Sequence, residues 1–433
     1  MHRHLTILAT AVAMLFFCAA SAAAMGSAPP PTWPEQHAID NHDLMSDGLG
    51  GWNILQDDYR AFHYLDGLSL EWDYYSLHDD DGDFTGVVGN VVADPKGHIG
   101  GYRYFFTPNL MPSGVNTAFY GKFAGEPAFA IYIPFGLGHQ IGKNERTLYA
   151  SDDQGRWTKM TPVRAANGQP DRIILEGDCG PYSWNLTVSA MWPEYAALKP
   201  DTWEIGNDTE GILCDEHWTV NMIWPTTKVT GQVVKDATGE VVEIDGHGYR
   251  ENSFGRWAFV AGGWDFAFMS DPDTRVQWAF QTYHFNTGDL DFVDVDFMDN
   301  GNPVTQQFAV DAGELGWYHD DWTYDTTARQ YVPKNLRVVG KNDQYTVEAT
   351  VTINDDYAPM LSDVTPVVST YCIFAQMPWV TGTITRSSTG EVVATFDGQG
   401  GGEFSLLRNF GENAPWGHTP EFFSSKFQSA FPR

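Results

Sequence analysis

Short segments of alternating apolar and polar residues, separated by turn residues, recur along the chain from about residue 60 to its end. One clear example is the run from Val229 to Val234, which is followed by the turn-forming residues Lys235 to Gly239 and by a second run from Glu240 to Ile244. This arrangement is typical of a β-hairpin. Helical periodicity is weak and is best at Ser189 to Leu198. The sequence therefore predicts an all-β protein.

Two sequence patterns occur twice and in the same order. Trp72 to His78, which leads into a Gly-Asp pair, resembles Trp278 to His284, which lies 206 residues later. Thr238 to Glu251 resembles Thr389 to Glu403, at separations of 151 and 152 residues. Matched starts and matched ends predict a duplicated β-domain.

The repeat places the domain boundary near residue 259, with an N-terminal unit at 61–258 and a C-terminal unit at 259–433. Each unit has the size of a β-barrel or a β-sandwich. Small barrels enclose packed side chains or one small apolar ligand. The site is therefore expected in a lumen or at the seam between the two units.

The composition excludes some classes of protein. The 433 residues include 56 acidic and 25 basic side chains, with a formal net charge of −31. Such a chain repels phosphate backbones and anionic lipid, so a nucleic-acid partner is not expected. A hydrophobic share of 42% and 16 tryptophans indicate a folded core. Acidic residues alternate with apolar ones from Asp289 to Phe297, which predicts a strand with one face in water.

The N-terminus indicates export. Residues 1–24 combine a basic start, an apolar run and a small-residue segment, as a signal peptide does, with an uncleaved anchor as the alternative. Residues 25–60 read as a linker or an N-terminal arm. We expect a secreted or periplasmic protein with no stable membrane span once the signal is removed. In an oxidising compartment Cys179 could pair with Cys214 and leave Cys372 free, but the sequence does not fix the connectivity.

One segment concentrates ionisable groups between glycines, namely Gly246 to Gly255. On an extended strand His247, Tyr249 and Glu251 face the same side. Burial raises the pKa of a carboxyl group, so Tyr249 and Glu251 could act as a proton-transfer pair. Glu403 occupies the matching place in the second repeat, so a structural role for Glu251 is the alternative. The chain shows no Ser-His-Asp, nucleotide-binding or zinc motif.

Several of these segments carry a resemblance to a known family. They are Glu71-Trp72 with Tyr74, then Trp224-Pro225, then Gly246 to Tyr249 closing with Phe254-Gly255. With them the chain resembles the lipocalin-like superfamily that includes carotenoid 1,2-hydratase, attH-domain proteins, kievitone hydratase and the fungal Diels-Alderases. The resemblance covers most of the chain after residue 60. It implies two tandem lipocalin-like β-barrel or sandwich domains, and it implies that no metal and no nucleotide cofactor is used.

In the hydratase branch of that superfamily, a His-x-Trp and a later Tyr-x-Asp act on an isolated double bond. Trp224 and Tyr249 match in type and spacing, whereas Met222 stands in place of the His and Glu251 in place of the Asp. The resemblance thus implies Glu251 as the proton donor, with Tyr249 and His247 as its partners. The residues implied to bind substrate are Trp224, Met222, Trp72 and Tyr74.

Two functions remain open on this evidence. The first is an exported, cofactor-independent lyase or isomerase, hydratase-like or cyclase-like, which acts on a hydrophobic unsaturated substrate such as a terpenoid, carotenoid or polyketide. The second is a non-catalytic carrier of a lipid or pigment. The retained carboxyl and tyrosine favour the enzyme, and Met222 favours the carrier or a cyclase that needs no acid.

Overall fold

The structure is a computed structural model. It describes residues 69–93, 114–136, 139–141, 148–164, 170–192, 195, 209–210, 215–256, 263–283, 292–309, 312–328, 330–361 and 371–407. The predicted signal peptide and arm lie outside these residues.

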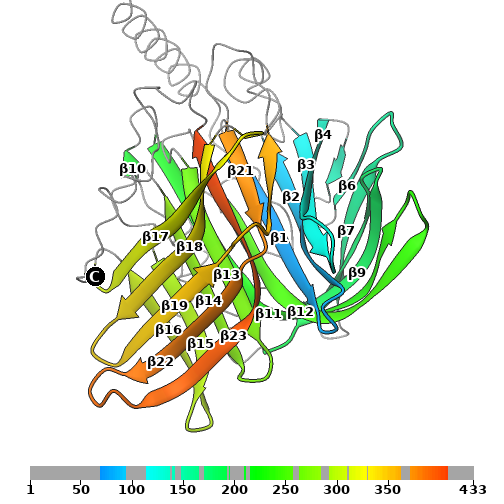
Figure 1. Ribbon diagram of the computed structural model, residues 1–433. Helices are drawn as coiled ribbons and strands as arrows, with labels where there is room; N and C mark the ends of the chain where they lie inside the picture. The colour runs from blue at the N-terminus through cyan, green and yellow to red at the C-terminus, as the bar shows by residue number, and fades with distance from the viewer. Residues whose placement is uncertain are drawn as a thin grey trace, which may run out of the picture.

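The described strands form two antiparallel sheets, one from each half of the chain (Figure 1). The first sheet contains β1 (Ser69–Asp79), β2 (Phe84–Ala93), β3 (Gly114–Phe123), β4 (Phe129–Gly136), β5 (His139–Ile141), β6 (Leu148–Ser151), β7 (Trp157–Arg164), β8 (Pro170–Asp178), β9 (Tyr182–Ala190), β10 (Thr209–Glu210), β11 (Asp215–Lys235) and β12 (Glu240–Arg256). The second contains β13 (Gly263–Asp271), β14 (Val276–Tyr283), β15 (Phe292–Asp299), β16 (Asn302–Ala309), β17 (Leu315–Asp325), β18 (Gln330–Lys341), β19 (Tyr345–Thr352), β20 (Tyr357–Leu361), β21 (Tyr371–Gln376), β22 (Trp379–Arg386) and β23 (Val392–Leu407).

The two sheets share one topology. In each, the last strand of the unit returns to pair with the first, β12 with β1 and β23 with β13. Each sheet curls around its own core, and the two lie side by side (Figure 1). The all-β prediction of two tandem lipocalin-like units is confirmed. The exact boundary stays a prediction, because residues 257–262 lie outside the described part.

Strand alternation explains why there are separate cores. On β2, Val88 points into the core of the first sheet, whereas Val87 and Val91 point to the opposite face. That opposite face is also buried, because it packs against the second sheet in a cluster that includes Phe266 and Phe268. The seam between the sheets is therefore a third apolar layer.

The buried seam overturns the expectation of a wet face on 289–297. Asp294 and Asp296, on β15, are fully buried. The acidic face of this strand is covered rather than solvated, and Asp294 lies close enough to Tyr249 of the first sheet to influence its pKa. Asp289 and Asp291 lie outside the described residues.

The start of the repeat must be reassigned. Trp72 pairs with Ser253 on β12 and Trp264 pairs with Ser405 on β23, and the two serines are 405 − 253 = 152 residues apart, as the repeat ends are. Trp264 is thus the counterpart of Trp72. Trp278 lies on β14, the second strand of its sheet, so the predicted match between Trp72 and Trp278 is wrong.

The predicted helix at Ser189 to Leu198 and the suggested disulfide are not found among the described residues. Ser189 and Ala190 end β9, so no helix begins there, although Tyr195 is helical. Cys179 is a free, buried thiol, so its suggested pairing with Cys214 is not seen. Among the described residues no helix is both long and apolar enough to cross a membrane.

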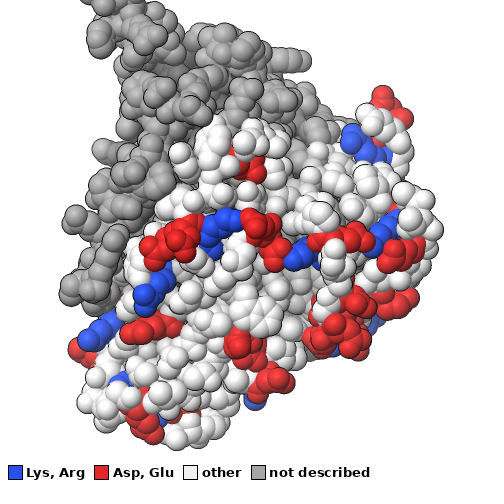
Figure 2. Space-filling view, viewed as in Figure 1, with Lys and Arg blue, Asp and Glu red and all other residues white. Residues whose placement is uncertain are grey.

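Acidic and basic side chains lie close together on the face drawn in Figure 2, where they form a mixed band. The surface ion pairs of the protein include Lys334 with Asp355 and Lys122 with Asp356. The second of these joins β3 of the first sheet to the turn before β20 of the second, so surface charge also ties the two sheets together.

Candidate functional site at the seam

The seam brings equivalent aromatic residues of the two sheets into contact. The rings of Trp72 and Trp264 lie edge to face with centroids 5.5 Å apart. Tyr74 and its counterpart Phe266 also meet edge to face, at 5.6 Å. Aromatic pairs in this geometry are favourable beyond their buried area. They fix the first strands of the two sheets, β1 and β13, against each other.

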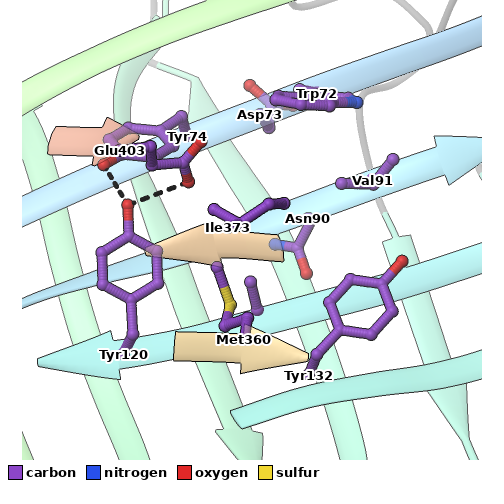
Figure 3. A pocket seen from close by; sticks show the side chains of 12 residues that line it. Trp72, Asp73, Tyr74, Asn90, Val91, Tyr120, Tyr132, Met360, Ile373 and Glu403 are labelled. Atoms are coloured by element: carbon purple, nitrogen blue, oxygen red, sulfur yellow. Dashed lines mark hydrogen bonds between the residues drawn. The ribbon is translucent and has the colours of Figure 1, made fainter. Parts of the chain in front are cut away.

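A small cavity lies beside these rings (Figure 3). Its volume is about 40 Å³, which exceeds the ~10–15 Å³ that a cavity needs to hold one water. The first sheet contributes β1 to β4, and the second contributes β20, β21 and β23. The lining residues are Trp72, Asp73, Tyr74, Gly89, Asn90, Val91, Ala118, Tyr120, Tyr132, Met360, Ile373 and Glu403.

The carboxyl group of Glu403 enters this cavity from β23. It is almost fully buried and accepts two hydrogen bonds, from Trp264 Nε1 at 3.0 Å and from the Tyr120 hydroxyl at 3.1 Å. Burial raises the pKa of Glu403 above its usual value, while the two hydrogen bonds act in the opposite direction. An acid that holds its proton at higher pH than usual is thus placed in an apolar cavity.

Two tyrosine hydroxyl groups form a chain of hydrogen bonds that ends at the Glu403 carboxyl group. The hydroxyl of Tyr120 is hydrogen-bonded to that of Tyr74 as well as to Glu403 (Figure 3). Burial, followed by the nearby Glu403 carboxyl, raises the pKa of both phenols well above the ordinary value, so both stay protonated. When Glu403 is ionised, Tyr120 donates to it and Tyr74 donates to Tyr120. When Glu403 carries the proton, both bonds can reverse.

Tyr249 and Glu251, the predicted proton-transfer pair, do lie together. The Tyr249 hydroxyl donates to Glu251 Oε2 at 2.7 Å, and its ring stacks on Phe268 at 4.8 Å. Burial, followed by the charge of Glu251, raises the pKa of Tyr249 well above its usual value. The pair lies at the seam but does not line the cavity around Glu403.

The remaining predicted residues have different positions. His247 contacts Asp80 and the Ser270 carbonyl rather than Glu251. Trp72 and Tyr74 line the cavity, and their role in binding substrate stays a prediction. Met222 and Trp224 belong to β11, where Trp224 pairs with Arg250 across the ladder. Their side chains lie outside the described residues.

Sequence reasoning missed three members of the site. Glu403 entered only as the repeat partner of Glu251, although that repeat is the signal that could have identified it. Trp264 was hidden by the mistaken match of Trp72 to Trp278. Tyr120 lies in no motif, and only the contact between the sheets places it beside Glu403.

Each sheet also holds a buried aspartate at an equivalent position of its first strand. Asp73 pairs with Arg250 Nη2 at 3.0 Å, and both side chains are fully buried. Asp265 pairs with His319 Nε2 at 2.6 Å. Within the described ranges no three His, Cys, Asp or Glu side chains come together as metal ligands.

The fold and the seam define a class: an all-β protein of two lipocalin-like units with a buried acid between them. No protein-family model matches the chain, and no curated protein sequence matches it. Among solved structures it is similar to a protein assigned as AttH from Nitrosomonas europaea, with a TM-score of 0.51 and 12% identity over 88% of this chain and 98% of that one. This likeness is one of fold, and it agrees with the fold that the resemblance implies.

Two further solved structures are similar at lower scores. Kievitone hydratase from Nectria haematococca has a TM-score of 0.45 and 12% identity, and CghA has a TM-score of 0.47 and 10% identity. For both, the match covers 79% of this chain and 89% of the other.

Proposed function

We propose that the chain is a lyase or isomerase of the hydratase or cyclase kind, acting at the seam cavity on a hydrophobic unsaturated substrate, with Glu403 as the acid. The observation that carries this proposal is the buried Glu403 carboxyl, whose pKa is raised and which faces an apolar cavity. A general acid works best when its pKa lies near the working pH. The need for neither metal nor nucleotide cofactor is part of the proposal.

The chemistry follows from the groups in the cavity. Protonated Glu403 transfers its proton to one carbon of a double bond, whose π electrons form the new C–H bond and leave a cation on the other carbon. In a hydration, water adds to that cation and its released proton returns to the Glu403 carboxylate. In an isomerisation, a neighbouring C–H bond supplies the returning proton and a double bond forms at a new place.

The surrounding residues support each step. Trp264 and Tyr120 hold the two carboxyl oxygens in fixed directions. The faces of Trp72 and Tyr74 can stabilise a developing positive charge. Met360, Ile373 and Val91 provide apolar surface for the hydrocarbon part of a substrate. A terpenoid or polyketide is much larger than about 40 Å³, so the walls have to separate to admit it.

The test compares the two equivalent acids. The compound that co-purifies with the full chain is identified by mass spectrometry and incubated with native protein, Glu403→Gln and Glu251→Gln. We expect Glu403→Gln to lose about 100-fold or more of the turnover, and Glu251→Gln to lose less than about tenfold. A larger loss in Glu251→Gln would make Glu251 the acid.

The same experiment addresses the carrier function. A native protein that binds the compound and leaves it unchanged is a carrier, and the enzyme proposal then fails. Binding is measured separately for all three proteins, so that lost turnover is not confused with lost affinity.

Export also belongs to this proposal, because it rests on residues 1–24 alone. Expression of the full gene product with its N-terminus intact should yield a secreted or periplasmic protein that begins after the small-residue segment. N-terminal sequencing of the exported fraction checks this, and a retained full-length chain would contradict it.

A further inference from the structure

His247 lies where three elements meet. Its Nδ1 is 2.8 Å from Asp80 Oδ1, in the turn after β1, and its Nε2 is 3.1 Å from the carbonyl oxygen of Ser270 on β13. A carbonyl oxygen and an ionised carboxylate can only accept hydrogen bonds. A neutral imidazole carries one N–H and an imidazolium carries two. Both contacts are satisfied together only when His247 is protonated.

We propose that protonated His247 is a clasp between the two sheets that opens as the pH rises, and that it thereby regulates access to the seam cavity. The regulatory part rests on the function proposed for that cavity. The clasp itself rests only on the geometry around His247.

Charged and titratable groups of both signs lie near His247. Lys228, the cross-strand neighbour of His247 on β11, lies 2.6 Å from Asp245 and 3.6 Å from Asp80, so it shares the two carboxylates. The His78 ring is centred 5.7 Å from the His247 ring. Burial, followed by the charge of His247, holds the pKa of His78 well below its usual value, so His78 stays neutral. The two rings therefore carry at most one positive charge between them, and it lies on His247.

Two further acids lie close to the clasp, one on each sheet. Asp79 accepts from the backbone N–H groups of Asp83 and Asp245. Asp271 accepts from the backbone N–H groups of Asp273, Thr274 and Asp397. Both carboxylates are occupied by backbone N–H groups of their own turns and of the neighbouring strands β12 and β23, which leaves Asp80 and the Ser270 carbonyl as the acceptors for His247.

The clasp is connected to the cavity through β13. Ser270 is at the end of this strand, and Trp264, which holds Glu403, is at its beginning. When His247 loses its proton, one of its two ring nitrogens presents a lone pair to an acceptor oxygen, and that contact becomes repulsive. The end of β13 then loses the contact with His247 and keeps the hydrogen bond from the Ser270 hydroxyl to the Gly248 carbonyl oxygen. It is therefore less firmly held to β12, and so are the walls that a large substrate must separate.

Hydrogen exchange of the full chain, followed by mass spectrometry, tests the clasp without any substrate. Exchange is compared at about pH 5 and about pH 8, the range in which histidine changes charge, after correction for the intrinsic rate. In native protein we expect peptides of Gly246–Tyr249 and Trp264–Asp271 to exchange about tenfold faster at the higher pH, as the loss of one charged hydrogen bond implies. Peptides of β18 and β19 serve as an internal reference that does not change.

Two variants make the test specific. His247→Phe should exchange fast at both pH values. Asp80→Asn should stay protected at both pH values, because the asparagine amide can accept a hydrogen bond from Nδ1 or donate one to it while Nε2 still donates to the Ser270 carbonyl. The Asp80 side chain is 54% exposed, so the fold tolerates this substitution. A flat native profile, or the same pH response in Asp80→Asn as in native protein, would overturn the clasp. Because no substrate is involved, that failure leaves the role of Glu403 open to its own test.

Discussion

Trp72 and Trp264 occupy equivalent positions on the first strands of the two sheets, and each ring packs against the other. Contact between a residue and its own counterpart is the mark of an isologous interface. Tyr74 and Phe266 repeat the relationship. The two units therefore meet about an approximate twofold axis. This explains why two equivalent acids, Glu251 and Glu403, both come to the seam while their surroundings differ.

The first prediction concerns the pH dependence of stability at Glu403. Its pKa is raised in the folded state, so the contribution of Glu403 to stability is present below the ordinary glutamate pKa and is lost as the pH rises through the folded value. Relative to Glu403→Gln, native protein should lose unfolding free energy as the pH increases above about 4.3. Urea unfolding over a pH series measures this. A difference that stays constant with pH would contradict it.

The second prediction concerns the glycines of β12. A Cβ built on Gly248 would lie 1.9 Å from the carbonyl oxygen of Ser76 on β1, which is backbone and cannot move aside. Gly248→Ala should therefore lower the unfolding free energy by about 1–3 kcal/mol. Gly89→Ala is the matched control, because its Cβ would meet Ala118 at an ordinary 3.8 Å. Thermal and urea unfolding would refute the prediction if both variants were equally stable.

The third prediction concerns the buried pair of Asp73 and Arg250. Removal of one partner leaves an uncompensated charge in the core, so Arg250→Met should cost about 3–5 kcal/mol of unfolding free energy. The surface variant Lys228→Met, which breaks an exposed pair, should cost less than about 1 kcal/mol. The double variant Asp73→Leu with Arg250→Met should recover much of the loss. Equal costs for Arg250→Met and Lys228→Met would show that the pair is not buried in solution.

The fourth prediction concerns the thiol of Cys179. Burial raises its pKa to about 12, and its Sγ donates to the carbonyl oxygen of Tyr182. Thiolate is the reactive form, so the native thiol should resist alkylation. Iodoacetamide at mildly alkaline pH should label the Cys179 peptide slowly in native protein and rapidly in urea, as peptide mass spectrometry can follow. Rapid labelling in native protein would count against this burial.

The hairpin of β11 and β12 shows what the sequence predicts well. Alternation ends at Lys235 and resumes at Glu240, and Gly239 has the positive φ of 70° that such a turn needs. Both the alternation and the turn glycine are properties of residues that are close in sequence.

The pattern around Glu251 and the matching pattern around Glu403 each lie within a short segment of the sequence. The duplication could therefore be inferred from these segments, even though Trp72 was matched to the wrong tryptophan.

The seam could not be predicted in the same way. Tyr120 and Glu403 are 283 residues apart, and nothing near either residue indicates the other. Asp294 alternates with valines as a solvated residue does, yet the packing of the two sheets buries it. Which face of a strand meets water depends on how distant strands pack, and alternation alone carries no information about that.

The hydrogen-bonded chain from Tyr74 through Tyr120 to Glu403 crosses from one unit to the other. The acid and its phenol partners are thus encoded in opposite halves of the gene. A chimera that joins the first half of this protein to the second half of a relative would keep two intact folds and could still lose the site. The candidate site therefore depends on both units, because Tyr120 on β3 and Glu403 on β23 are the two ends of one hydrogen bond between them.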